Sequence, residues 1–382
     1  MSETLTILDR LIGFETVTNT PNLELAGYAE NYLKACGFRV TRLPSHCGEK
    51  LGLYAEIGPA GDGVMLSAHT DVVPVEGQNW SKPPFRLTQD MDRLYGRGTT
   101  DMKGYVASML SLADRIAAKD LREPLKMVLS YDEEIGCVGM QEMLERLAPL
   151  IGQPRACFVG EPTEMQVAVG HKGKAALRAR CFGQSGHSAL APKFVSALHL
   201  AADMVAELRT IQAVYEQSGA KDLAYSVPFA TFHVGTLNGG TALNIVPDHA
   251  ELAFEYRHLA SDSGKKILAE IEQMARSVAA PYRARYPEAR IEIEQYNAYP
   301  GLDVSPNEGV TALAQKLAQT NETTKVAFGT EAGFFSELGI PTVVCGPGSM
   351  EGQGHKPDEY LSLSQLAACD AMMDRILDDI SS

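Results

Sequence analysis

Imidazole and carboxylate side chains follow directly after several short apolar runs in this sequence. His69 and Asp71 come after the run 64–68, and because they lie two residues apart they project to the same side of an extended strand end. One of them can therefore bind a metal ion while the other accepts the N–H of the ligating imidazole and fixes its tautomer. The alternative is a hydrogen-bonded turn without a metal.

Two adjacent carboxylates, Glu133 and Glu134, follow the apolar run 127–129. At the tip of a buried strand they repel one another and lose solvation unless a cation compensates their charge. Because neighbouring residues point in different directions, one can coordinate a metal while the other acts on a water as general base and acid. A solvated acidic turn is the alternative.

Three more candidate ligands lie in loops, and they are Asp101, Glu161 and His355. The ordinary alternatives are a helix cap, a surface turn and a structural loop histidine, respectively. Together with His69 and Glu134, however, these residues supply the nitrogen and oxygen donors that suit Zn²⁺, Co²⁺ or Mn²⁺. We therefore predict a metal centre without thiolate ligands.

Elements of an α/β sheet must position these side chains. The apolar runs before the motifs are typical of buried strands with polar tips, and the segment 105–118 between two of them has helical periodicity. In such sheets ligands bind outside the carboxyl ends of parallel strands, so the polar tips are expected to converge. The strand 342–345 and the helix 363–380 resume this style near the C-terminus.

Between these parts the pattern changes to the order β-α-β-β-α-β, which is that of a ferredoxin-like sandwich. The expected elements are strands 175–181, 230–236, 250–258 and 290–296 and helices 191–208 and 263–278. Because such a unit is self-contained, we predict an inserted domain at 173–297. Residues 1–172 and 298–382 would form the discontinuous catalytic domain around it.

Composition favours an ordinary globular protein that acts on a small molecule. The 382 residues are 45% hydrophobic and 21% charged, and the formal net charge of −14 disfavours nucleic-acid or membrane partners. The N-terminus lacks the features of a secretion signal, and no apolar run reaches the roughly 18 residues of a membrane span. The seven scattered cysteines form no C-x-x-C pair and indicate reduced thiols, so we expect a cytoplasmic protein.

In their order along the chain, the motifs resemble those of the M20 metallopeptidase family over nearly the full length. They are His69-Thr-Asp71-Val-Val-Pro74, Gly96-Arg-Gly-Thr-Thr-Asp101-Met-Lys-Gly104, Asp132-Glu133-Glu134-Ile-Gly136, Gly160-Glu161-Pro-Thr163 and His355-Lys-Pro-Asp-Glu-Tyr360. Within the family the chain is most similar to the acetylornithine deacetylases, with succinyl-diaminopimelate desuccinylases, aminoacylases and glutamate carboxypeptidases as relatives. The fold that the resemblance implies is a phosphorylase/hydrolase-like mixed sheet with an inserted ferredoxin-like α+β lid and dimerisation domain.

The resemblance also implies two divalent metal ions, with Zn²⁺ as first choice and Co²⁺ or Mn²⁺ as alternatives. Asp101 would bridge the two ions. His69 and Glu161 would complete one site, and Glu134 and His355 the other.

Catalytic roles follow from the same resemblance. Asp71 would orient His69, while Glu133 would deprotonate the attacking water and then protonate the departing amine. His187, in the Gly/Ser-rich motif 183–188, would stabilise the oxyanion in its own site or in that of a partner subunit. Without the resemblance, a structural role in a turn is the simpler interpretation of His187.

Substrate contacts are implied for Asn244, for Arg257, whose guanidinium suits a carboxylate, and for Gly348 and Ser349 in their loop. Glu331 agrees with the pattern of the deacetylases and differs from that of the desuccinylases, so it could attract the ammonium of an ornithine. Helix capping is the alternative for Glu331.

The expected reaction is removal of the acetyl group from N2-acetyl-L-ornithine, a step of arginine biosynthesis, by a homodimer joined through residues 173–297. A desuccinylase or a general N-acyl-amino-acid aminoacylase would use the same chemistry on another substrate. The alternative from a different class of protein is a metal-binding scaffold without turnover. The presence of Glu133 together with every proposed ligand in the sequence disfavours it.

Overall fold

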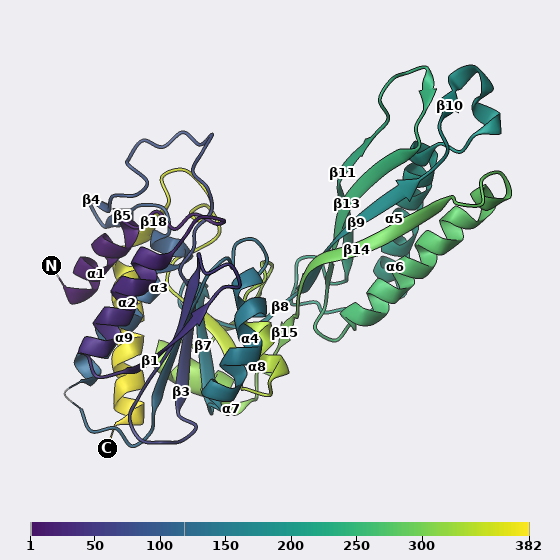
Figure 1. Ribbon diagram of the computed structural model, residues 1–382. Coiled ribbons are helices and arrows are strands. Elements are labelled where there is room, and N and C mark those ends of the chain that lie inside the picture. The colour runs from purple at the N-terminus through teal and green to yellow at the C-terminus, as the bar shows by residue number, and fades with distance from the viewer. Residues whose placement is uncertain (1, 118, 382) are drawn as a thin grey trace. The chain divides into compact units, whose positions relative to one another are not determined.

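The computed structural model describes residues 2–117 and 119–381 and divides into two compact units (Figure 1). The first unit contains the chain up to Gly170 and from Leu302 onward, and the second is His171–Gly301. The predicted insertion, 173–297, lies within the second unit and is a few residues shorter at both ends.

A large mixed sheet forms the centre of the first unit. Within the described residues it has nine strands in the order β1-β2-β6-β3-β7-β17-β8-β15, with β16 paired to β8. Their bounds are β1 Arg39–Pro44, β2 Leu51–Ile57, β3 Val64–His69, β6 Leu125–Ser130, β7 Ala156–Pro162, β8 Val167–His171, β15 Leu302–Asp303, β16 Thr323–Val326 and β17 Thr342–Gly346. Because β6, β3, β7 and β17 are parallel, their carboxyl ends share one edge of the sheet.

Helices flank this sheet on both faces (Figure 1). They are α1 Glu3–Ile12, α2 Leu23–Ala35, α3 Gly104–Ile116, α4 Val138–Ile151, α7 Gly309–Ala318, α8 Ala332–Glu337 and α9 Leu363–Ile380. Every residue of β3 and β6 is buried, as expected for strands covered on both sides, which explains why most of their residues are apolar. The predicted helix 363–380 matches α9, while residue 118, the predicted end of the other helix, lies outside the described residues.

A small antiparallel sheet joins two loops that carry candidate ligands. It consists of β4 Thr88–Asp90, β5 Arg93–Tyr95 and β18 Tyr360–Ser362, in the order β18-β5-β4. Tyr360 lies opposite Tyr95 in this sheet. The pairing therefore brings the chain just after His355 next to the glycine-rich segment that leads to Asp101.

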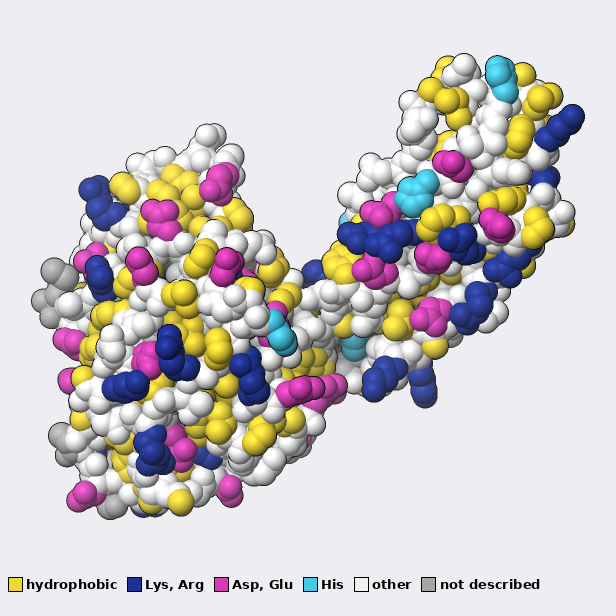
Figure 2. All heavy atoms as spheres, in the orientation of Figure 1, with side chains coloured by type: hydrophobic (Ala, Val, Ile, Leu, Met, Phe, Trp, Pro, Cys, Tyr) yellow, Lys and Arg dark blue, Asp and Glu magenta, His cyan; other side chains and the backbone are white. Residues whose placement is uncertain are grey.

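The second unit has the predicted ferredoxin-like order of elements, and its sheet order is β11-β13-β9-β14 with antiparallel pairs. The elements are β9 Gly173–Phe182, α5 Ala197–Ser218, β11 Thr231–Gly239, β13 His249–His258, α6 Gly264–Ala279 and β14 Arg290–Tyr299. Acidic and basic side chains intermingle over these strands (Figure 2), where Arg178 lies 3.1 Å from Glu251 and Arg180 lies 2.5 Å from Glu294. The polar residues on this face alternate with the buried ones that pack on the helices.

Helix α5 differs from its prediction at both ends. The sequence predicts a helix over 191–208, but α5 begins at Ala197 and continues to Ser218. Pro192 lies instead in the 3-10 helix Ser188–Lys193, since proline disfavours the α conformation of the residue before it. At the other end, the buried stripe of α5 continues past Leu208 to Ile211, so packing on the sheet extends the helix.

All seven cysteines are free thiols, and every one except Cys47 is buried. This fits the expectation that they are reduced and mostly fill the core. Among the described residues, no helix is long and apolar enough to cross a membrane.

Candidate metal centre

The candidate ligands of the first unit come from the edge where the parallel strands end. His69 is the last residue of β3, and Glu161 lies near the end of β7. Glu134 follows β6, and His355 lies in the loop after β17. Asp101 belongs to the short helical segment Thr99–Lys103 that precedes α3.

Asp101 lies between the two imidazoles. Its Oδ1 is 3.1 Å from Nε2 of His69, and its Oδ2 is 3.1 Å from Nε2 of His355. The same Nε2 of His69 is 3.6 Å from Oε1 of Glu161, and that of His355 is 2.9 Å from Oε2 of Glu134. The five predicted ligands thus form two clusters that share Asp101.

Glu133 lies close to the first of these clusters. Potential ligand atoms of His69, Glu133 and Glu161 lie within 4.8 Å of one another, as do those of His69, Asp101 and Glu134. The adjacent carboxylates Glu133 and Glu134 therefore face the same small volume, but it is Glu134 that contacts His355.

The arrangement fits two divalent cations. Metal–ligand bonds of about 2.0–2.2 Å place neighbouring donors of a tetrahedral site about 3.3 Å apart, close to the contacts of 2.9–3.6 Å within these clusters. Oε1 of Glu134 is buried and has no hydrogen-bond partner among the described residues, so it can accept a cation. Three carboxylates and two imidazoles are also the donor set that such ions prefer.

The electrostatics of the site favour cations. Burial and the neighbouring Asp101 together raise the pKa of Glu134 to about 7, against the lowering effect of His355. Burial likewise raises the pKa of Glu161 well above its ordinary value, against the lowering effect of His69. A divalent cation would offset both burial and repulsion, because it stabilises the ionised carboxylates.

The pKa values of the two imidazoles are also raised, which for these groups favours the charged form. Hydrogen bonds to Asp101 and Glu134 raise the pKa of His355 to about 10. Burial lowers the pKa of His69, but Glu161 and Asp101 outweigh it and raise that pKa well above its usual value. Metal ions and protons therefore compete for these nitrogens, because only the neutral imidazole binds a metal.

Asp71 contacts both His69 and the pair of glutamates. Nδ1 of His69 lies 3.0 Å from the backbone oxygen of Asp71 and 3.5 Å from its Oδ1, so the carbonyl makes the closer contact. The carboxylate of Asp71 accepts the N–H of Glu133 at 3.0 Å and that of Glu134 at 3.2 Å. Asp71 thus fixes the backbone of both glutamates as well as the ring of His69, a link that the sequence motifs did not reveal.

A buried ion pair behind Asp101 was also missed. Oε1 of Glu359 accepts the N–H of Thr100 at 2.9 Å and that of Asp101 at 3.2 Å, while Oε2 lies 2.6 Å from Nη1 of Arg97. The side chains of Arg97 and Glu359 are both 1% exposed. Both residues belong to the quoted motifs, but their pairing joins segments far apart in the sequence, so no local signal identifies it.

A second missed pair anchors the loop after β6. Nζ of Lys50 lies 2.5 Å from Oδ1 of Asp132, and both side chains are largely buried. Asp132 has a φ of +52°, a left-handed conformation that aspartate tolerates better than most residues. The pair holds the start of the loop that carries Glu133 and Glu134.

The substrate-binding candidates of the first unit are Gly348, Ser349 and Glu331. The N–H of Gly348 donates to Gln365 Oε1 at 3.2 Å, and that of Ser349 donates to Gln353 Oε1 at 3.4 Å. Glu331 is only 1% exposed, and within the described part of the chain its Oε1 has no hydrogen-bond partner. Burial raises the pKa of Glu331 to about 7. Its side chain forms no cap bond to α8, so helix capping is not its role.

Three candidates lie in the second unit. His187 belongs to the short strand β10 Gly186–His187, which pairs with β12 Ile245–Val246. The structure brings Asn244 next to this pair, because its backbone oxygen accepts the N–H of the residue after His187 at 3.0 Å. Arg257 lies near the far end of β13 from that turn, where its Nε contacts Glu255 at 3.0 Å.

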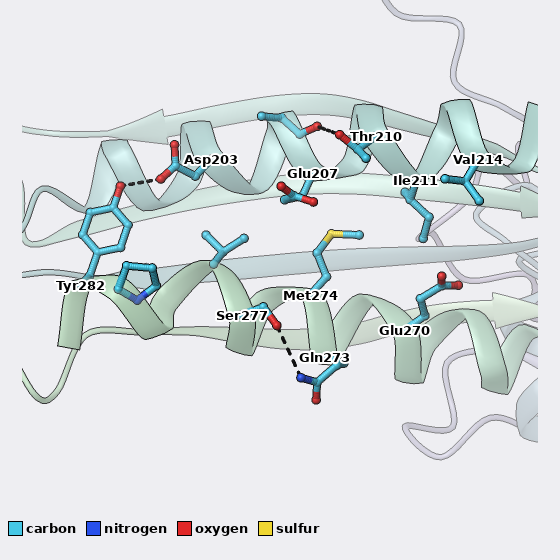
Figure 3. Close-up of a pocket in the computed structure, with 13 residues that line it drawn as sticks. Asp203, Glu207, Thr210, Ile211, Val214, Glu270, Gln273, Met274, Ser277 and Tyr282 are labelled. Atoms are coloured by element: carbon cyan, nitrogen blue, oxygen red, sulfur yellow. Dashed lines mark hydrogen bonds between the residues drawn. The ribbon is translucent and has the colours of Figure 1, made fainter. Parts of the chain in front are cut away.

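Helices α5 and α6 of the second unit enclose a groove of about 750 Å³ (Figure 3). Its lining combines apolar side chains such as Ile211 and Met274 with carboxylates such as Asp203, which accepts a hydrogen bond from Tyr282 at 2.5 Å. None of the predicted site residues, all of which the structure describes, lines this groove. The candidate centre is therefore the ligand cluster of the first unit.

Comparison with known proteins places the chain in a family. The family model described as Peptidase family M20/M25/M40 matches residues 65–379. The acetylornithine deacetylase of Shigella sonnei is 32% identical over 348 residues, which cover 91% of this chain and 88% of that protein. The acetylornithine deacetylase of Proteus mirabilis is 31% identical over 364 residues, which cover 95% of this chain and 91% of that protein.

Solved structures share the fold. An M20 family metallo-carboxypeptidase from Sulfolobus solfataricus aligns with a TM-score of 0.80 at 20% identity and covers 99% of both chains. A dinuclear metal-binding peptidase of the M20 family from Bacillus subtilis aligns with a TM-score of 0.67 at 17% identity and covers 99% of this chain and 97% of its own. With the ligand clusters and the family match, the chain belongs to Peptidase family M20/M25/M40 and is a metal-dependent amide hydrolase.

Proposed function

We propose that this enzyme removes the acetyl group from N2-acetyl-L-ornithine to give L-ornithine and acetate, as a step of arginine biosynthesis. Two curated relatives whose alignments cover more than nine-tenths of the chain are acetylornithine deacetylases. The observation that carries the hydrolytic chemistry is Asp101 between two clusters of ligands, with Glu133 beside them. Free thiols in the buried core suit the reducing cytoplasm, where we expect the enzyme to act.

His69, Asp101 and Glu161 would hold one ion, and His355, Asp101 and Glu134 the other. When bound, the ions would polarise the amide carbonyl and lower the pKa of the attacking water. Zn²⁺ is the first choice for these nitrogen and oxygen donors, and Co²⁺ or Mn²⁺ suits the same set.

Glu133 would carry the proton between the water and the departing amine. Its backbone is fixed by the bond to Asp71, so the carboxylate has a defined place beside His69 and Glu161. Burial raises the pKa of Glu133 well above its ordinary value, which makes it a better proton acceptor. A base that has taken the proton from water can then donate it to the nitrogen of the broken amide.

Binding of the amino-acid part of the substrate is assigned to Asn244, Arg257 and Glu331, with Gly348 and Ser349 as further loop contacts. The Arg257 guanidinium suits the substrate carboxylate. Oε1 of Glu331 lacks a donor, so an ammonium that reached it would supply one inside the buried site. An unchanged preference for cationic substrates in Glu331→Gln would remove this assignment.

We further propose a homodimer joined through the second unit. β11 is the last strand of its sheet, and within the described part of the chain its outer edge pairs with no other strand. Leu237 on this strand is 44% exposed, and exposed edges with apolar side chains readily pair with a second chain. Sedimentation analysis is expected to give twice the chain mass, and a monomer at micromolar concentration would contradict the proposal.

His187 would stabilise the oxyanion in its own or the partner's site. Mixing inactive His187→Ala with inactive Glu133→Gln distinguishes the two arrangements. If His187 acts in the partner's site, mixed dimers regain one intact centre and activity returns. If it acts in its own site, the mixture stays inactive.

The substrate is tested with chelated and metal-reconstituted enzyme on three compounds, namely N2-acetyl-L-ornithine, succinyl-diaminopimelate and N-acetyl-methionine. We expect turnover only after reconstitution and the highest kcat/KM on acetyl-ornithine. Preference for the succinyl compound would identify a desuccinylase, and equal rates on both acetyl compounds a general aminoacylase. No turnover with both ions bound would indicate a metal-binding scaffold.

A further inference from the structure

Cys137 is tied to Glu133 by two hydrogen bonds. Its Sγ donates to Oε1 of Glu133 at 3.3 Å, and its backbone N–H donates to the carbonyl oxygen of Glu133 at 2.7 Å. The side chain of Cys137 is fully buried at the turn between β6 and α4. A core cysteine that only filled space would have no reason to contact the carboxylate of the proposed base.

The backbone of this turn is unusual at the same residue. Cys137 has a φ of +56°, and Gly136 before it has a φ of +100°. An L-residue with a β-carbon seldom adopts the left-handed conformation, and glycine adopts it freely. The conformation alone therefore favours glycine at 137, so the presence of a side chain there indicates a role for the thiol.

The thiol leaves Glu133 with one free oxygen. Burial raises the pKa of Cys137 well above its usual value, so the sulfur keeps its proton and can donate it in a hydrogen bond. Among the described residues, Oε1 of Glu133 accepts this bond while Oε2 accepts none. A carboxylate held at one oxygen and at its backbone has a fixed plane, with the second oxygen available to a water.

We propose that Cys137 is a positioning residue that holds Oε1 of Glu133 so that Oε2 meets the attacking water. The inference rests on the proposed function, in which Glu133 is the general base. Cys137 is none of the residues that we propose as ligands of metal or substrate. Loss of its thiol should therefore lower the rate of the chemical step and leave substrate binding and metal content unchanged.

Three substitutions separate positioning from packing. Cys137→Ser keeps a donor of similar size, Cys137→Ala removes the donor, and Cys137→Gly removes it while relaxing the left-handed backbone. Kinetics on the best substrate of the panel, metal analysis and circular dichroism are measured for all three. We expect kcat to fall about tenfold in Cys137→Ala and Cys137→Gly, with KM within about twofold of the wild-type value. Cys137→Ser should keep at least about a third of the wild-type kcat.

A wild-type kcat in both Cys137→Ala and Cys137→Gly would overturn the inference. An equal loss of kcat in Cys137→Ser and Cys137→Ala would also overturn it. The Gly variant keeps the test decisive if Cys137→Ala folds poorly, because its backbone is unstrained. Glu133→Gln, measured in parallel, tests the role of Glu133 separately from the role of Cys137. If Glu133→Gln is inactive while the Ala and Gly variants match the wild type, only the role of Cys137 is wrong, whereas an active Glu133→Gln would remove the proposed function of Glu133 itself.

Discussion

At the scale of single residues, we propose different tasks for two neighbouring carboxylates because their surroundings differ. Oε2 of Glu134 contacts His355 at 2.9 Å, while Oε1 of Glu133 contacts Cys137. Asp71 accepts the backbone N–H of both and sets where each side chain starts. The division between ligand and base thus depends on side chains that the paired acidic motif does not contain.

Replacement of Glu133 by glutamine tests this division. The amide keeps the size of the side chain but cannot take a proton, so kcat should fall by about 10²–10⁴-fold while two ions per chain remain bound. Steady-state kinetics and metal analysis measure the two effects. Glu134→Gln is the matched control, because it should lose affinity for the ion near His355. Loss of metal from Glu133→Gln would show instead that Glu133 is a ligand.

Asp71→Asn tests the contact that organises the site. The asparagine keeps one acceptor oxygen but loses the charge that faces His69 and the two backbone N–H groups. Partners of metal ligands typically contribute about 10–100-fold to metal affinity, and we expect a loss in that range by chelator competition. Asp92→Asn, at an exposed position, is the control and should not change the affinity.

At the scale of elements, the sequence predicts the helices and strands that depend on local patterns of apolar and polar residues. The ends of β3, β6 and β7 were recognised because a buried apolar run stops at a polar residue, and α9 because its periodicity is uninterrupted. The start of α5 was wrong because Pro192 lies inside the apparent helix. The five proposed ligands were selected by residue type and by family motif, whereas the pairing of Arg97 with Glu359 spans 262 positions and depends on the tertiary fold.

That pairing gives a prediction for the segment that carries Asp101. Glu359→Gln leaves the buried guanidinium of Arg97 without its counter-charge, which should lower the free energy of unfolding by about 3–5 kcal/mol. Urea unfolding of the metal-free protein measures this without a contribution from bound ions. Glu351→Gln, at an exposed position, should change stability by less than about 0.5 kcal/mol. Equal midpoints in the two variants would mean that the pair does not stabilise the fold.

At the scale of the whole molecule, the chain contains two units with separate sheets and unequal chemistry. The first unit contains every predicted metal ligand and Glu133, and the second contributes an antiparallel sheet whose edge strand β11 has one strand neighbour among the described residues. The sequence indicated this division because the order of elements changes near residue 173. It could not indicate the groove between α5 and α6, because the groove depends on how two helices pack.

Stability against pH is a property of the whole chain, and His171 gives it a defined contribution. The imidazole is buried, and burial lowers its pKa to about 4. Its Nδ1 lies 3.0 Å from the backbone oxygen of Lys172, while its Nε2 has no hydrogen-bond partner in residues 2–117 and 119–381. The unfolded chain therefore takes up a proton near pH 6.5, and the folded chain does so only near pH 4.

This difference in pKa determines how the free energy of unfolding changes with pH. Since the unfolded state binds more protons between these pH values, the contribution of His171 is fully present above about pH 6.5 and is lost as the pH falls. Between pH 6.5 and 5 the loss amounts to about 2 kcal/mol. Urea unfolding of chelated wild type and His171→Gln over this range should give a steeper decline for the wild type. The slopes are compared rather than the absolute stabilities, so parallel curves would mean that the buried ring is already protonated in the folded chain.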